Sequence, residues 1–125
     1  MASRIIGTPS VRVAMAVGRQ HTIASVIIPA HNEEAVIART LRAMLDGARP
    51  GELEIIVVCN GCTDHTAAIA RTFGDDVQVI ETEVGNKAIA LNLGDETATR
   101  FPRFFVDADI DLPVDSIRET ARVLA

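Results

Sequence analysis

The sequence predicts an α/β fold built on a mainly parallel β-sheet with helices on both faces. Short runs of β-branched residues alternate with longer stretches whose apolar residues recur at helical spacing. This alternation is typical of strands joined by crossover helices, which produce a parallel sheet. Hydrophobic residues make up 48% of the 125 residues, which is enough for one buried core, so a single folded domain is expected.

The elements can be placed in order along the chain. Four strands are expected, at Ile23–Ile28, Leu53–Cys59, Val77–Thr82 and Arg103–Val106. Four helices are expected, over Glu33–Leu45, from Thr63 or Asp64 to about Phe73, over Lys87–Glu96, and from Pro113 onward. Residues 1–22 are interpreted as an N-terminal extension. Residues 23–125 are interpreted as one domain that is incomplete at its C-terminus, because no boundary signal follows the last helix.

Composition excludes several classes of partner and location. Twelve basic against seventeen acidic residues, with no Trp or Tyr, argue against nucleic-acid binding, which needs positive charge or stacking aromatics. No apolar run approaches the ~20 residues of a membrane helix, so no transmembrane segment is expected. Two cysteines only three positions apart cannot staple a fold, and a cytoplasmic location is expected, with peripheral association with a membrane left open.

The first polar cluster leaves the first strand and runs from Pro29 to Glu34. Ligands of open parallel sheets bind beyond the carboxyl ends of the strands, where this cluster falls. Pro29 is expected to end the strand ladder and Asn32 to cap the helix, while Glu33 could accept a hydrogen bond from a ribose hydroxyl. The alternative is a capped strand-to-helix turn without a ligand.

The second cluster, from Cys59 to Asp64, follows the second strand. Asn60 could read the edge of a nucleobase, whereas Thr63 and Asp64 also suit ordinary helix caps. Cys59 and Cys62 form a C-x-x-C pair that could be redox-active at a helix N-terminus. The neighbouring Asp64 carboxylate disfavours a thiolate, and no second ligand pair exists for zinc.

Two further clusters follow the third and fourth strands. Gly85-Asn86-Lys87 opens a helix, and Lys87 stands where it could contact a diphosphate. A solvated lysine in a first helical turn is the commoner explanation of such a residue. Asp107-Ala108-Asp109 directly follows the fourth strand. Carboxylates this concentrated repel one another unless a divalent cation such as Mg²⁺ or Mn²⁺ occupies the site. The alternative for Asp107 and Asp109 is a solvated acidic loop.

Taken together and in order, the four motifs resemble those of family 2 glycosyltransferases. The motifs are SVIIPAHNEE at residues 25–34, EIIVVCNGCTD at 54–64, GNKAIALNLG at 85–94 and FVDAD at 105–109. The resemblance implies the GT-A fold, a Rossmann-like α/β sandwich, and inverting transfer of a sugar from a nucleotide-diphosphate sugar to an acceptor hydroxyl. It also implies a donor-binding set and, within that set, two metal ligands for Mn²⁺ or Mg²⁺, Asp107 and Asp109. The donor-binding set is Pro29, Ala30, Glu33, Asn60, Asp64, Lys87, Asp107 and Asp109.

The sequence also departs from the family pattern. Asn60 stands where many members have aspartate and Cys62 where serine is usual, which leaves the identity of the base open. Members of the family carry the general base and the acceptor pocket after the D-x-D region, so no catalytic base is assigned, and a missing C-terminal part or a partner chain is expected. A noncatalytic nucleotide-binding remnant, or one subunit of a split enzyme, is therefore the alternative function. A small thiol oxidoreductase is a further alternative that leaves Asp107 and Asp109 unexplained.

Overall fold

The computed structural model describes residues 21–124, so nearly all of the predicted extension at 1–22 lies outside the described residues. Within them one sheet of four parallel strands has the order β3-β2-β1-β4. The strands are β1 (Ala24–Ala30), β2 (Leu53–Asn60), β3 (Val77–Thr82) and β4 (Arg103–Phe105). The predicted α/β class and the parallel sheet are confirmed.

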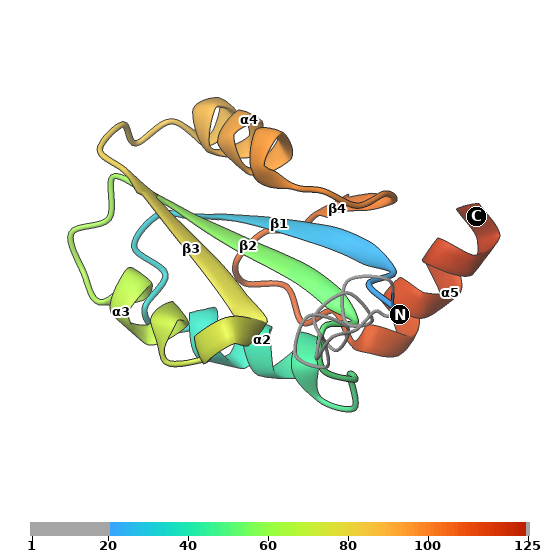
Figure 1. Ribbon diagram of the computed structural model, residues 1–125. Coiled ribbons are helices and arrows are strands. Elements are labelled where there is room, and N and C mark those ends of the chain that lie inside the picture. Colours follow the sequence, from blue (N-terminus) through green and yellow to red (C-terminus); the bar gives the residue numbers. More distant parts are fainter. Residues whose placement is uncertain (1–20, 125) are drawn as a thin grey trace, which may run out of the picture.

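Helices cover both faces of this sheet (Figure 1). They are α2 (Ile37–Leu45), α3 (Thr66–Arg71), α4 (Lys87–Thr97) and α5 (Val114–Leu124), with a short 3-10 turn, η1 (Gly74–Asp76), before β3. Of the helices that the structure describes, α4 lies on one face, and α2, α3 and α5 lie on the other (Figure 1). None of the helices between residues 21 and 124 has the length and apolar character that crossing a bilayer requires.

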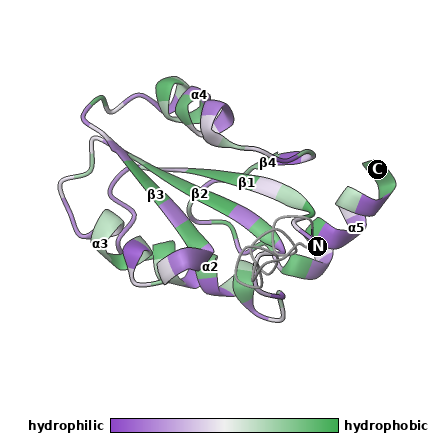
Figure 2. Cartoon of the chain, in the orientation of Figure 1, coloured by the Kyte–Doolittle hydropathy of each residue, from purple (hydrophilic) through white to green (hydrophobic). Residues whose placement is uncertain are grey.

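The core is built from the two central strands, which are hydrophobic along most of their length (Figure 2). Successive side chains of β1 point to opposite faces, so Val26 and Ile28 pack toward α2 and α5 whereas Ile27 packs toward α4. Helix α4 approaches β1 closely at Gly94, where an added Cβ would lie 2.3 Å from Ile27 Cγ2. Burial on both faces explains why these strands read as continuous apolar runs.

Strand β1 continues through Pro29, contrary to the expectation that this residue ends the ladder. Pro29 still pairs with Val58 of β2. The Ile27 carbonyl accepts a hydrogen bond from the Val106 N–H on the β4 side. The backbone nitrogen of Pro29, two residues further on, points to the same side. Because β4 ends at Phe105, the missing proline N–H costs no ladder bond there.

Helices α2 and α3 begin later than predicted. The sequence predicts α2 from Glu33 and α3 from Thr63 or Asp64, but the helices begin at Ile37 and Thr66. The intervening backbone and side chains hydrogen-bond across from one loop to the other instead of entering a helix. Tertiary contacts therefore override local capping signals in both loops.

Candidate functional site

The strand order puts a topological switch point beside β1. The chain moves outward from β1 through β2 to β3 and then returns to place β4 on the other side of β1. The loops that leave β1 and β4 consequently lie next to each other at the carboxyl edge of the sheet. In open α/β sheets, ligands bind in the crevice that forms at such a point.

A cavity of about 270 Å³ lies at this crevice and gathers residues from four separate segments. Six of the eight predicted donor-site residues line it, together with two residues that were not predicted. The lining consists of Pro29, His31, Glu33, Asn60, Lys87, Asp107, Ala108 and Asp109. Residues that are up to 80 positions apart in the sequence thus face one space.

Carboxylates dominate the charge of this cavity. Glu33, Asp107 and Asp109 contribute three negative charges and Lys87 one positive charge, which leaves a formal charge of −2 with a neutral histidine. Lys87 Nζ lies 2.7 Å from Asp107 Oδ1, and both side chains are more than half exposed. An anionic ligand would be repelled here unless a cation accompanied it.

Asn60 is the most buried polar side chain that faces the cavity, with 5% of its surface exposed. Its Nδ2 donates to the Ala30 carbonyl over 3.1 Å, which fixes the orientation of the amide. Within residues 21–124 no hydrogen bond reaches Asn60 Oδ1, so an acceptor and the second amide hydrogen are available to a ligand.

His31 belongs to the cavity but was missed by the sequence reasoning. Its Nδ1 lies 2.7 Å from the Asn60 carbonyl oxygen. Because a carbonyl oxygen can only accept, Nδ1 is the donor in this hydrogen bond. The available signal was its position between Ala30 and Asn32, but only the pairing of β1 with β2 brings the ring to Asn60.

Two predicted donor-site residues, Ala30 and Asp64, do not line the cavity. Ala30 is 1% exposed, and its carbonyl accepts from Asn60 and from the Cys62 thiol. Asp64 accepts from the Thr66 N–H over 3.0 Å and from the Glu34 N–H over 3.2 Å. Partial desolvation raises the pKa of Asp64, but these hydrogen bonds outweigh it and hold the pKa below its usual range.

The sequence matches the Glycosyl transferase family 2 pattern over residues 25–124. The chain belongs to glycosyltransferase family 2. A relative in Bacillus subtilis (strain 168), probable glycosyltransferase YdaM, is 44% identical over 78 residues, which cover 56% of this chain and 19% of that protein. The chain thus spans about a fifth of this relative.

Solved glycosyltransferases share the fold. The mannosyltransferase PcManGT of Pyrobaculum calidifontis, solved with GDP-Man and Mn²⁺, is 31% identical with a TM-score of 0.70, covering 82% of this chain and 32% of that one. TarS of S. aureus, solved with UDP-GlcNAc, is 24% identical with a TM-score of 0.71, covering 81% of this chain and 30% of that one. The predicted GT-A fold of this family 2 member is confirmed, and the chain spans about a third of these structures.

In this family 2 chain, the cavity provides two carboxylates as ligands for a divalent cation. They do not form a complete set of protein ligands. Asp107 and Asp109 are both exposed and both line the cavity. Among residues 21–124, no group of three or more His, Cys, Asp or Glu side chains is arranged to hold a metal. One or two protein carboxylates completed by phosphate oxygens and water are the usual ligand set of Mg²⁺ in nucleotide sites, so these residues fit a cation bound together with a diphosphate.

The cysteine pair of the second loop is reduced in this structure. Cys59 and Cys62 are both free thiols, and Cys59 is buried at the end of β2. Burial, together with the adjacent Cys62, raises the pKa of the Cys59 thiol to about 12. A thiol that stays protonated is a poor nucleophile, which weighs against the thiol oxidoreductase alternative.

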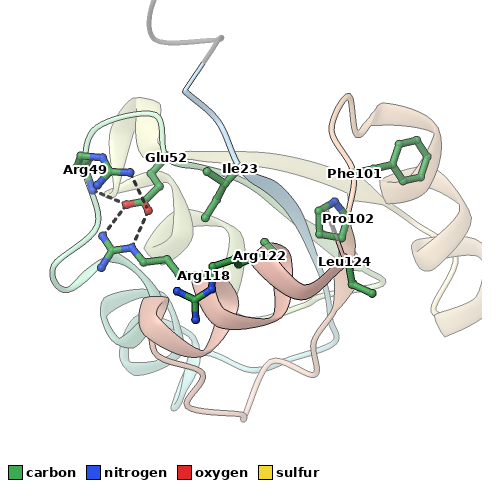
Figure 3. A pocket seen from close by; sticks show the side chains of 9 residues that line it. Ile23, Arg49, Glu52, Phe101, Pro102, Arg118, Arg122 and Leu124 are labelled. Atoms are coloured by element: carbon green, nitrogen blue, oxygen red, sulfur yellow. Dashed lines mark hydrogen bonds and ion pairs between the residues drawn. The ribbon is translucent and has the colours of Figure 1, made fainter.

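A larger cavity, of about 700 Å³, lies near the amino ends of β1 and β4 (Figure 3). Ile23, Phe101, Pro102 and Leu124 give it a mainly apolar wall (Figure 3). Its one carboxylate, Glu52, is already bound by Arg118 and Arg49. Its guanidinium groups are paired with carboxylates, Arg49 and Arg118 with Glu52 and Arg122 with Glu119, so volume alone does not identify the functional site.

Proposed function

We propose that the cavity at the β1/β4 switch point is the donor site of a family 2 glycosyltransferase and binds a nucleotide-diphosphate sugar together with Mn²⁺ or Mg²⁺. The observation that carries this proposal is the convergence of six predicted polar-motif residues, from four separated segments, on one cavity. Family membership supports the same activity.

The nucleoside end of the donor is assigned to the loops after β1 and β2. Asn60 offers an amide whose free Oδ1 and remaining N–H match the adjacent donor and acceptor on the edge of uracil or guanine. Glu33 would accept from a ribose hydroxyl, and Pro29 would contribute apolar surface. Ala30 and Asp64 act in this proposal through the loops that they hold, since neither lines the cavity.

The diphosphate end is assigned to the β4 exit and the start of α4. Asp107 and Asp109 would hold the cation, which when bound offsets the charge of the diphosphate and of the departing nucleoside diphosphate. Lys87 would turn from Asp107 toward a phosphate oxygen, because an ammonium group has three donors to share. The formal charge of −2 in the cavity is the physical reason to expect that nucleotide binding requires the cation.

Transfer itself is proposed as one inverting displacement, in which an acceptor hydroxyl attacks the anomeric carbon and the nucleoside diphosphate leaves. The chain spans about a third of the solved glycosyltransferases that it matches. The general base that takes the hydroxyl proton, the acceptor and its pocket are therefore not assigned to residues of this chain.

Calorimetric titration with UDP and with GDP, each with and without Mn²⁺, tests the donor site. We expect binding that requires Mn²⁺ and that falls at least tenfold in an Asp107→Ala, Asp109→Ala double variant. The matched control is Asp75→Ala, Asp76→Ala, which removes two exposed carboxylates of η1 and should leave the affinity unchanged.

The outcomes separate the candidate functions. Mn²⁺-dependent binding with turnover of a sugar donor supports the transferase, and preference for one nucleotide identifies the base. Binding with neither transfer nor hydrolysis supports the noncatalytic nucleotide-binding module or a split-enzyme subunit. A folded sample that binds neither nucleotide refutes the donor site.

A further inference from the structure

The loop that follows β1 is tied to the loop that follows β2 by hydrogen bonds in both directions. The Glu33 N–H donates to Thr66 Oγ1 over 2.9 Å, and the Glu34 N–H donates to Asp64 Oδ2 over 3.2 Å. In return, the His65 N–H donates to Glu34 Oε1 over 3.0 Å. Apart from Thr66, the first residue of α3, these residues lie in neither a strand nor a helix, so the loops depend on one another for their conformation.

Asn32 makes two further bonds of this set and stands between two cavity residues. Its side-chain Oδ1 accepts from the Thr63 N–H over 2.8 Å, and its own N–H donates to Cys62 Sγ over 3.3 Å. His31 and Glu33, its immediate neighbours, both line the cavity, whereas Asn32 does not. Its contacts therefore reach the neighbouring loop and not the space that a donor would fill.

The backbone of Asn32 adds a second constraint. Its φ is 52°, and it is the one non-glycine residue with positive φ among residues 21–124. Asparagine tolerates this left-handed conformation better than other residues that carry a Cβ. Asn32 thus fixes the turn between His31 and Glu33 in two ways, through its left-handed backbone and through its side-chain hydrogen bond.

We propose that Asn32 is a positioning residue of the donor site, which holds His31 and Glu33 in the orientation that the donor requires before the donor arrives. This inference rests on the proposed function. Without the Asn32 side chain, the loop after β1 would become ordered only when the donor binds. The conformational entropy lost in that ordering would weaken binding. Its contribution therefore concerns affinity more than global stability.

Asn32→Gly separates these effects, because glycine retains the left-handed backbone and removes only the side-chain bond. We expect affinity for the Mn²⁺-nucleotide complex to fall roughly tenfold, with little change in melting temperature. Hydrogen exchange of the Thr63 amide should quicken in the free protein and slow again when nucleotide is added.

Asn32→Asp keeps the acceptor and should recover most of the affinity in about 0.15 M salt, where distant charges are screened. Asn92→Ala, on the exposed side of α4, is the matched control.

Failure of this inference differs from failure of the donor site. If the unmodified protein binds nucleotide and Asn32→Gly binds equally well with an unchanged Thr63 amide, Asn32 has no positioning role. If Asn32→Gly lowers the melting temperature and Asn32→Asp recovers neither property, its role is structural. If the unmodified protein binds neither nucleotide, the proposed function itself fails.

Discussion

Replacing Glu52 with glutamine should destabilise the protein by about 3 kcal/mol at neutral pH. Glu52 is 1% exposed and precedes β2. Arg118 of α5 donates to both of its carboxylate oxygens, over 2.7 and 2.8 Å, and Arg49 donates over 3.3 Å (Figure 3). The carboxylate thus fastens α5 and the preceding loop to the start of the central strand.

The magnitude follows from the pKa of Glu52. Hydrogen bonding from Arg118 is the main cause that lowers this pKa from 4.5 to about 2, against the opposing effect of burial. Each pH unit between the unfolded and folded values corresponds to about 1.4 kcal/mol, which gives about 3 kcal/mol. Because the folded pKa is the lower one, this stability is fully present above about pH 4.5. It falls to roughly 1 kcal/mol near pH 3 and is lost below pH 2.

Urea unfolding of the unmodified protein and of Glu52→Gln, at several pH values from about 7 to 3, measures this directly. The difference in the free energy of unfolding should shrink as the pH falls. Glu119→Gln is the control, because Glu119 is an exposed partner of Arg122 on the same helix, and exposed pairs contribute about 0–1 kcal/mol. A difference that stays constant over the pH range would refute the assignment of the stabilisation to the Glu52 carboxylate.

Two further predictions concern packing and thiol reactivity. Gly94→Ala should destabilise the protein by about 1–3 kcal/mol in thermal unfolding, because the added Cβ would lie 2.3 Å from Ile27 Cγ2. An exposed helical glycine would show the opposite sign, so a rise in melting temperature would contradict the close packing of α4. With Ellman's reagent near pH 8, Cys62 should react well before Cys59, whose pKa burial raises to about 12. Equal rates for the two thiols would contradict the burial of Cys59.

The sequence was sufficient to predict the sheet and the edge at which its polar motifs meet. Continuous β-branched runs such as Ile55–Val58 are buried on both faces, and this requires a parallel sheet with helices on each side. Polar residues that follow several strands then meet at one edge, as Asn60, Lys87 and Asp107 do. These predictions depend on local sequence patterns and need no knowledge of contacts between distant loops.

What could not be predicted depends on contacts between distant loops. Glu33 and Asp64 were placed in or at helix starts, but their loops bond to each other before α2 and α3 begin. Asp64, which the sequence assigns to the donor site, accepts from backbone and hydroxyl groups and does not line the cavity. His31 was overlooked because its place in the cavity follows from the register of β1 against β2, which no local pattern encodes.

Paramagnetic broadening of backbone amide signals by Mn²⁺, recorded with UDP or GDP present, tests the central claim most directly. Broadening should centre on residues 107–109 and extend to His31, Glu33, Asn60 and Lys87, which line the same cavity. Signals near Glu52, at the other cavity, should keep their intensity. Broadening spread over exposed carboxylates elsewhere, such as those of α5, with residues 107–109 unaffected, would contradict the donor site.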